Sequence, residues 1–263
     1  MTGFLQRIRG LLLQEYYLSI HSLEIVIDTF IFPMMNLVLF GLISQYIGGG
    51  DSSKMPFLVL CVLLWEILVV NQYNVTVSSL WSVWSHNLTN IFIAPINAFE
   101  YMFAQIIAAG VRAIGVVFVL AVGAYFAFNF NILQVGVINL ALFTINLSLF
   151  AWWLGIVLLG FIFRYGVRLQ AIAWGTVFVI QPFMAAFYPV SVLPGWMQAI
   201  SHALPATYVF EAARTALTHP GVDWRSAAIA FVMNGGYFVA SGYLFAYLFR
   251  RSKESGQFAR NDL

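Results

Sequence analysis

Six long apolar stretches, separated by short polar connections, constrain the fold of this chain more than any other feature of its sequence. A bilayer core about 30 Å thick is crossed by about 20 helical residues, and each stretch is long enough. In lipid a crossing segment must satisfy its own backbone hydrogen bonds, which favours helices. We therefore predict an all-α integral membrane protein whose membrane domain covers residues 24–249. The six predicted transmembrane helices span residues 24–47, 55–77, 102–128, 134–163, 171–189 and 226–249.

The composition excludes two other classes of protein. Hydrophobic residues make up 62% of the chain and charged residues 8%, against roughly 45–50% and about 25% in a soluble domain. A water-soluble globule is therefore excluded. The 12 basic residues are too few to form the basic face that a nucleic acid requires, so no nucleic-acid partner is expected. The single cysteine, Cys61, lies in an apolar run and excludes an internal disulfide.

The distribution of lysine and arginine predicts the orientation in the membrane. With the N-terminus inside, eight basic residues face the cytoplasm and three face the outside. Residues 1–23 are too polar to span, and their apolar residues recur at helical spacing, so we predict an interfacial N-terminal helix. Residues 250–263 form a cytoplasmic tail, which places both termini inside the cell.

Residues 79–93, between the second and third stretches, carry apolar side chains at spacings of three and four. This is the stripe of one amphipathic helix. Ala94-Pro95 ends it, and Asn97 to Glu100 has the form of a capping box that starts the next helix. An interfacial helix anchored by tryptophans and a helix that docks on a partner both explain the pattern. The docking candidates are Trp81, Trp84, His86, Leu88, Ile91 and Phe92.

Residues 194–217, before the last stretch, predict two short helices separated at Pro205. Each would hold roughly 10–12 residues, too few to cross a bilayer, so they dip into the outer leaflet or lie along it. Glu211 and Arg214 are three residues apart and could pair, with a surface pair of little energetic value as the simpler interpretation. A plain extracellular loop is the alternative to two re-entrant helices.

Recognisable catalytic motifs are absent from the sequence. A phosphate-binding loop needs Gly-Lys-Ser/Thr, but the only lysines, Lys54 and Lys253, each follow a serine. No histidine is followed by glutamate and no Gly-x-Ser-x-Gly occurs, which excludes the helical zinc-protease motif and the hydrolase elbow. We therefore assign no catalytic residue, no metal site and no cofactor to this chain.

Glu66 and Arg112 lie inside predicted spans, where an ionisable side chain costs on the order of 2.5–3.5 kcal/mol. Both are near mid-depth on neighbouring antiparallel helices, so we predict that they pair, with contact to a transported substrate as the alternative. Other polar residues on the second and fifth spans either hydrogen-bond between helices or line a translocation path. These are Asn71, Gln72, Asn74 and Gln181.

Three segments together resemble the membrane subunit of type-2 ABC transporters, a class that includes exporters of drugs, lipids and polysaccharides. The resemblance covers nearly the whole chain and rests on the order and spacing of these three segments. They are Phe30–Gly49 with Phe32-Pro33, Asn87–Glu100 with Ala94-Pro95, and Tyr188–Arg214, in which Pro189-Val190-Ser191-Val192-Leu193-Pro194-Gly195-Trp196 precedes Leu204-Pro205-Ala206-Thr207-Tyr208.

The resemblance implies a homodimeric permease in the inner (plasma) membrane that works with two separate ATPase subunits, which would bind ATP and Mg²⁺. It implies that residues 79–93 form a coupling helix on the ATPase and that residues 194–217 form an outer gate. The expected substrate is amphipathic, lipid-linked or drug-like, and membrane lipid is a further partner. The alternatives are a secondary transporter or channel with Glu66 as its ion or proton site, and an intramembrane enzyme. The implied gate residues are Pro194, Trp196, Pro205, Tyr208, Phe210, Glu211 and Arg214.

Overall fold

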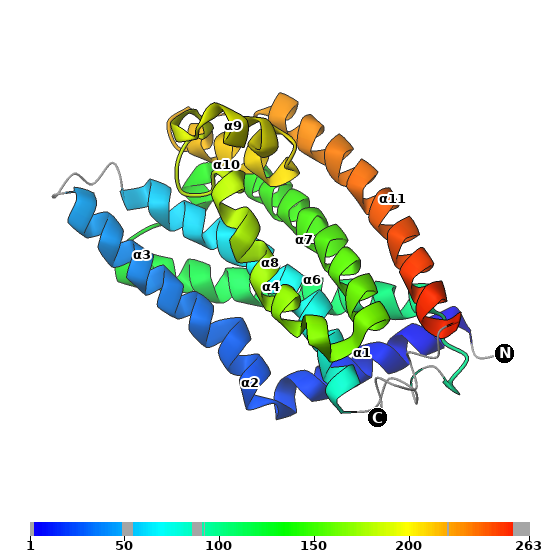
Figure 1. The fold of residues 1–263 in the computed structure, drawn as a ribbon. Coiled ribbons are helices and arrows are strands. Elements are labelled where there is room, and N and C mark those ends of the chain that lie inside the picture. The colour runs from blue at the N-terminus through cyan, green and yellow to red at the C-terminus, as the bar shows by residue number, and fades with distance from the viewer. Residues whose placement is uncertain (1–2, 49–54, 86–90, 92, 220, 255–263) are drawn as a thin grey trace.

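The computed structural model describes residues 3–48, 55–85, 91, 93–219 and 221–254. Within these ranges every regular element is a helix, and no strand occurs (Figure 1). Five helical segments are long and apolar enough to cross a bilayer, which confirms an all-α protein that crosses the membrane several times. They are Leu23–Tyr46, Pro56–Ser82, Ala98–Phe128, Val137–Tyr165 and Trp224–Glu254.

Long α-helices alternate with short π and 3₁₀ segments along the chain. The first half contains α1 (Phe4–His21), α2 (Leu23–Val26), the π segment η1 (Ile27–Ile31), α3 (Phe32–Gly48), α4 (Met55–Trp84) and α6 (Ala98–Phe128). The second half contains η2 (Ile132–Val135), α7 (Val137–Tyr165), η3 (Gly166–Leu169), α8 (Gln170–Ile180), η4 (Gln181–Met184), η5 (Val190–Val192), α9 (Gly195–His202), α10 (Pro205–Ala216) and α11 (Trp224–Glu254).

α4 and α7 form the centre of the bundle. The most apolar windows of these two spans are 72% and 67% buried, whereas those of the other three are between 22% and 33% buried. α11 packs along α7, α6 packs along α4, and α3 contacts both α4 and α6. Gly155 allows α4 and α7 to approach, because a Cβ atom there would lie 2.8 Å from Cγ1 of Val75. The outer helices therefore leave apolar faces for lipid.

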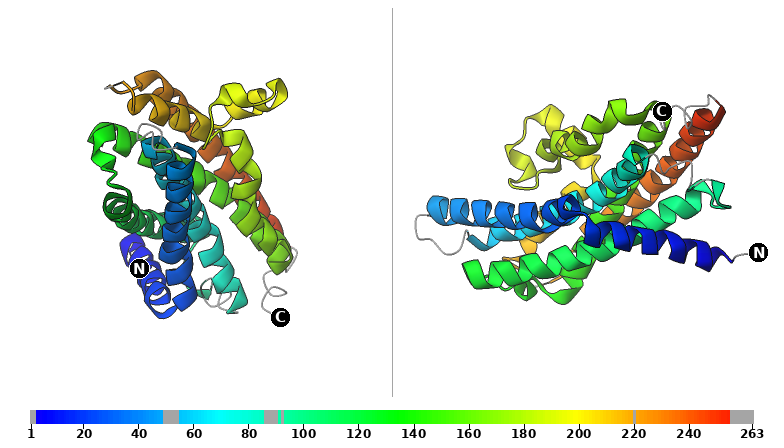
Figure 2. Two further views of the ribbon diagram at one scale, coloured as in Figure 1. Left: turned by 90° about the vertical axis from the view of Figure 1, so that its left-hand side faces the viewer. Right: turned by 90° about the horizontal axis from the view of Figure 1, so that it is seen from below.

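The two ends of the bundle carry different short elements. α1 lies at the end of the bundle where α11 also ends, whereas α9 and α10 lie at the opposite end (Figure 1). Figure 2 shows the same elements from two further sides. The loop between α6 and α7 and the start of α4 lie at the end that α10 covers, since Gln134, Pro56 and Thr218 line one cavity. This arrangement agrees with short helices on one membrane face and both described chain ends on the other.

α1 is a helix, as predicted, and it packs against α6. Its buried residues are Ile8, Leu11 and Glu15, so one buried position is a carboxyl group. Arg7 adds an ion pair with Glu100 at the start of α6, with Nη2 and Oε1 2.5 Å apart. Charge pairs as well as apolar contacts therefore fix α1 to the bundle.

The predicted fifth span, 171–189, is wrong as a single continuous helix. α8 has only 11 residues, η4 follows it with 3₁₀ geometry, and Ala185 then adopts a left-handed conformation with φ of 51°. Pro182 explains the break, because proline has no N–H and its ring crowds the carbonyl of Phe178. The segment nevertheless runs between the two ends of the bundle, since it starts just after α7 ends and η4 contacts α9 and α10 (Figure 1).

The predicted coupling helix 79–93 is also changed at its start. α4 continues without a break through Trp84, so residues 79–84 belong to this long helix. His86, Leu88 and Phe92 lie outside the described residues. The start of α6 follows the prediction: the Glu100 N–H donates to Oδ1 of Asn97 at 2.8 Å, and the Asn97 N–H donates to Oε2 of Glu100 at 3.0 Å.

The two short helices predicted over 194–217 are present as α9 and α10, with Pro205 as the first residue of α10. Proline suits this position, because the first helical N–H has no partner in any case. Pro194 lies just before α9. Trp196 is 63% exposed, as a residue at the membrane boundary would be, and Tyr208 is half-buried. Phe210, also named as a gate residue, is fully buried and packs in the main hydrophobic core.

Candidate functional site

A cavity of about 330 Å³ lies among η1, the start of α3, the middle of α4, and α8. We call it the acidic pocket. Its polar lining includes Asp28, Asn36, Glu66, Gln72 and Tyr73, and its apolar lining includes Phe32, Val69, Trp174, Val177 and Phe178. A mostly apolar cavity with a few convergent polar groups is the usual form of a small-molecule site.

Pro33 explains why the helix beside this pocket is irregular. Proline cannot donate a hydrogen bond to the carbonyl four residues earlier, at Thr29, and its ring crowds that carbonyl. The chain accommodates the missing bond with the π turn η1. This turn carries Asp28 and Thr29, which both line the pocket. The local sequence therefore builds one wall of the site.

Glu66 lies ten residues into the span Pro56–Ser82, about 15 Å from its start, and only 1% of it is exposed. Its Oε1 accepts a hydrogen bond from Nδ2 of Asn36 on α3 at 2.8 Å. Among the described residues, no Lys or Arg forms an ion pair with it. A carboxyl group at this depth with one amide partner is costly to bury, which makes Glu66 a candidate for a functional position.

Asp28 and Tyr73 join the helices around the pocket. The Tyr73 hydroxyl donates to Oδ2 of Asp28, which links α4 to η1. The indole of Trp174 on α8 meets the Tyr73 ring edge to face, with ring centroids 5.1 Å apart. Two carboxyl groups, one from η1 and one from α4, therefore line one cavity with aromatic walls.

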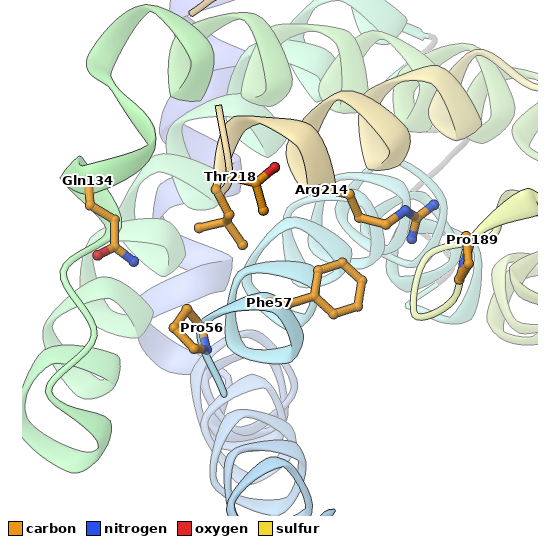
Figure 3. Close-up of a pocket in the computed structure, with 7 residues that line it drawn as sticks. Pro56, Phe57, Gln134, Pro189, Arg214 and Thr218 are labelled. Atoms are coloured by element: carbon orange, nitrogen blue, oxygen red, sulfur yellow. The ribbon is translucent and has the colours of Figure 1, made fainter. Parts of the chain in front are cut away.

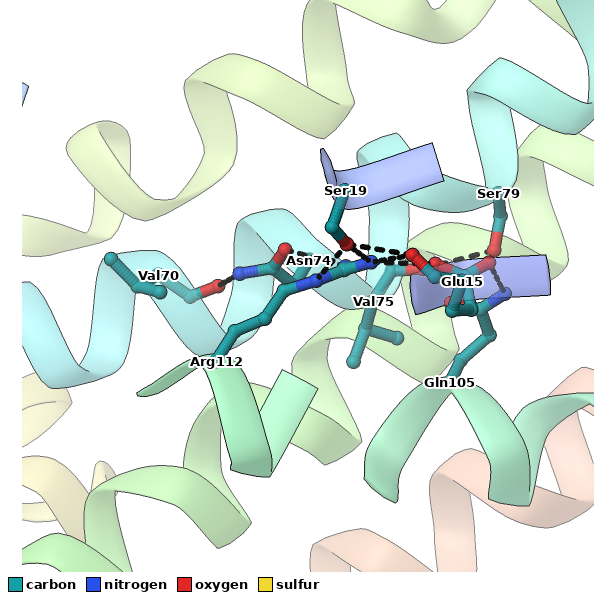
Figure 4. Close-up of polar contacts among 8 residues, drawn as sticks. All are labelled: Glu15, Ser19, Val70, Asn74, Val75, Ser79, Gln105 and Arg112. Atoms are coloured by element: carbon teal, nitrogen blue, oxygen red, sulfur yellow. Dashed lines mark hydrogen bonds and ion pairs between the residues drawn. The ribbon is translucent and has the colours of Figure 1, made fainter. Parts of the chain in front are cut away.

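Arg112 lies in a separate polar cluster, which we call the Arg112 network (Figure 4). Its Nη2 lies 2.9 Å from Oε2 of Glu15, and the two side chains are 11% and 4% exposed. Its Nη1 donates to Oδ1 of Asn74 at 2.8 Å, and its Nε donates to Oγ of Ser19 at 3.0 Å. Gln105 completes the cluster by donating to Oε1 of Glu15 at 2.8 Å. The network joins α1, α4 and α6.

The predicted pair of Glu66 with Arg112 is therefore wrong. Arg112 reaches α4 at Asn74, which is eight residues or about 12 Å along the helix from Glu66. The two charged groups also face different neighbours, since Glu66 bonds to α3 and Arg112 to α1. Equal depth along antiparallel helices was not enough to bring them together, because side-chain direction decides the contact.

Sequence reasoning missed both Glu15 and Asp28. Glu15 stands seven residues after Ile8 and four after Leu11, so helical spacing puts it on the buried face of α1. That spacing is a usable signal. Asp28 is four residues after Glu24 at the start of the first span, and its position in the pocket depends on the π turn.

The other polar residues predicted on α4 mostly join helices. Asn71 accepts a hydrogen bond from Nε1 of Trp152 at 2.8 Å and donates to Oγ of Ser148 at 3.2 Å, both on α7. Gln72 donates to the carbonyl of Ala173 on α8 at 3.1 Å and also lines the acidic pocket. Asn71 and Asn74 thus act in packing, whereas Gln72 contributes to both packing and the pocket. Gln181 opens η4 and is half-buried.

Glu211 and Arg214 form the ion pair expected from their spacing, with Oε1 and Nη2 2.8 Å apart. They are not a simple surface pair, because the Arg214 side chain is 13% exposed. Arg214 donates to the carbonyl of Ala185 and Glu211 accepts from the N–H of Val190, both at 2.8 Å. The pair therefore holds the loop after η4 against α10. Figure 3 shows Arg214 and Phe57 in a second cavity of about 490 Å³ at this end.

The candidate docking residues that the structure describes lie at the opposite end of α4. The rings of Trp81 and Trp84 meet edge to face at 5.3 Å. Trp84 lines an open groove together with Trp174 and Phe178 of α8, and these two residues also line the acidic pocket. Ile91 is buried in the cluster that contains Ile8 and Leu11 of α1.

The comparisons with known proteins identify one family. The model of the family described as ABC-2 type transporter matches residues 8–218. The match runs from α1 through the end of α10, so it includes the acidic pocket, the Arg112 network and the two short helices. A search of curated proteins found no match.

Proposed function

Because the chain belongs to the ABC-2 type transporter family, we propose that it is the permease subunit of an ATP-driven exporter, working as a homodimer with two separate ATPase subunits. Membrane proteins of this family form the translocation path and are not themselves catalytic. The proposed substrate is amphipathic, lipid-linked or drug-like. ATP and Mg²⁺ are assigned to the partner ATPase.

The acidic pocket is the observation that carries the proposal. It lies near the middle of the span Pro56–Ser82 and combines buried polar groups with aromatic walls. Polar groups at membrane depth that face a cavity are typical of a substrate path. The groove that carries Trp84 shares Trp174 and Phe178 with this pocket, which supports a route from the end of α4 toward it.

The two ends of the bundle have different proposed roles. The proposed docking site of the ATPase is the end of α4 with Trp81 and Trp84, together with residues 85–93. The spans are proposed to lie in the inner membrane, with this docking site in the cytoplasm. α9 and α10 form the proposed outer gate, with Arg214 and Glu211 holding the broken segment after α8. Motion of the ATPase at one end would reach the other through α4 and α8.

Affinity purification of the full chain from its native membrane tests this proposal. We expect an ATPase subunit to co-purify in equal amount, with a mass that fits two copies of each chain. Replacing Trp84 with glutamate should weaken this association, whereas replacing the exposed Trp224, at the far end of α11, with glutamate should not. Purification without an ATPase, together with transport driven by a proton or ion gradient, would favour the alternative in which Glu66 is an ion or proton site.

A further inference from the structure

We propose that the acidic pocket binds the positively charged group of an amphipathic organic cation and that the transported substrate belongs to this chemical class. The inference rests on the proposed function for the transport step, but the binding step stands on the pocket alone. It narrows the substrate from amphipathic molecules in general to those that carry an amine or a similar cation.

The charge of the lining is the first argument. Asp28 and Glu66 both line the cavity, and none of the described lining residues is Lys, Arg or His. Arg112, which lies in the span Ala98–Phe128, is occupied by Glu15, Ser19 and Asn74. The carboxyl groups of the pocket therefore lack a cationic partner from the described part of the chain. A bound cation would supply the missing charge.

Unused hydrogen-bonding capacity is the second argument. Glu66 is 1% exposed, and its one hydrogen bond uses Oε1, so Oε2 has no partner among the described residues. Thr29, also a lining residue, is 2% exposed, and its hydroxyl has no partner among them either. Buried polar groups without partners are costly and rare. An ammonium or guanidinium group would offer donors to both.

The apolar lining defines the rest of the ligand. Phe32, Trp174 and Phe178 line the same cavity, and aromatic faces attract cations and pack against apolar groups. A volume of about 330 Å³ lies within the range of sites for small organic molecules. A bare metal ion fits less well, because no group of three His, Cys, Asp or Glu side chains within the described residues could hold one.

Tetraphenylphosphonium and tetraphenylborate provide a matched pair of probes, because they have nearly the same size and shape and opposite charge. Binding of each probe to the purified full chain in detergent would be measured by equilibrium dialysis. The two probes are measured in separate samples, because they precipitate together as a salt, and we expect the phosphonium to bind and the borate not to bind. Asp28→Asn and Glu66→Gln should each weaken phosphonium binding about tenfold, equivalent to about 1.4 kcal/mol.

Two controls separate the pocket from general effects of charge and folding. Glu254→Gln removes one carboxylate from the exposed end of α11 and should leave the affinity unchanged. Glu66→Asp keeps the charge and should retain more affinity than Glu66→Gln. If the pocket variants do not fold, the wild-type chain still decides, because equal binding of phosphonium and borate would overturn the proposal.

Unchanged phosphonium affinity in folded Asp28→Asn and Glu66→Gln variants would also overturn the proposed cation site. This outcome is distinct from failure of the proposed function, because the assay contains no ATPase. A chain that assembles with an ATPase but does not bind the phosphonium would refute only the cation site. A chain that binds the phosphonium through Glu66 but assembles with no ATPase would refute only the ATP-driven mechanism.

Discussion

A guanidinium group inside a bilayer is tolerated only when a counter-charge and hydrogen-bond acceptors surround it. Arg112 obtains the counter-charge from Glu15 and further acceptors from Ser19 and Asn74. Glu15 comes from a helix that precedes the first span, and 97 residues separate it from Arg112. The charge of the third span is therefore neutralised by a segment outside the spans.

Removing one partner of this pair should destabilise the chain more than removing both. Glu15→Gln or Arg112→Gln leaves an unpaired buried charge, with an expected cost of about 3–5 kcal/mol, and the double variant should recover part of it. The measurement is the unfolding temperature of the full chain in detergent. Glu254→Gln is the control, since its exposed pair should contribute at most about 1 kcal/mol. Strictly additive losses would argue against the pair.

At the scale of single residues, the sequence identified the ionisable side chains inside the spans but not the residues that they contact. Glu66 proved to be buried and Arg112 partly buried, and both make specific polar contacts. Depth along a helix can be read from residue number, but the neighbour that a side chain faces depends on the rotation and packing of whole helices. Glu211 and Arg214 were predictable because they share one turn of one helix.

At the scale of single elements, polar residues misled the prediction of where α4 ends. Ser79 was assigned to a new helix, yet its hydroxyl donates to the carbonyl of Val75 at 3.0 Å within the same helix. A serine whose hydroxyl donates to a carbonyl of its own helix need not end that helix. Pro182 had the opposite effect, because it ends α8 inside an apolar stretch whose length alone predicted a full span. Hydropathy therefore located most spans but not these boundaries.

The close contact of α4 with α7 makes a prediction about Gly155. Gly155→Ala should destabilise the chain by about 1–3 kcal/mol, because the new methyl group would lie 2.8 Å from Val75 and force the helices apart. Gly115→Ala is the matched control, because no atom lies within 4 Å of a Cβ atom built there. Both variants would be compared by unfolding temperature in detergent. Equal unfolding temperatures for the two variants would mean that α7 shifts at no cost.

For the whole molecule, the arrangement of short elements predicts which surface faces each compartment. Cys61 is the only cysteine and is fully buried, so an introduced thiol can be labelled alone. A membrane-impermeant maleimide should label Trp196→Cys in intact cells and should label Lys253→Cys only after permeabilisation. If α9 and α10 are a gate, trapping the ATP-bound complex should also change the labelling rate of Trp196→Cys. Labelling of Lys253→Cys in intact cells would reverse the assigned orientation.

The attachment of α1 also has a consequence for the order in which the chain is assembled during synthesis. Because Glu15 is synthesised long before Arg112, we expect its carboxylate to lie among the lipid headgroups, where a charge costs little, until the third span is inserted. When Arg112 enters the bilayer, its counter-ion, the Glu15 carboxylate, is therefore already present. We expect α1 to be open to protease in nascent chains that stop before residue 98 and protected once they extend beyond Phe128.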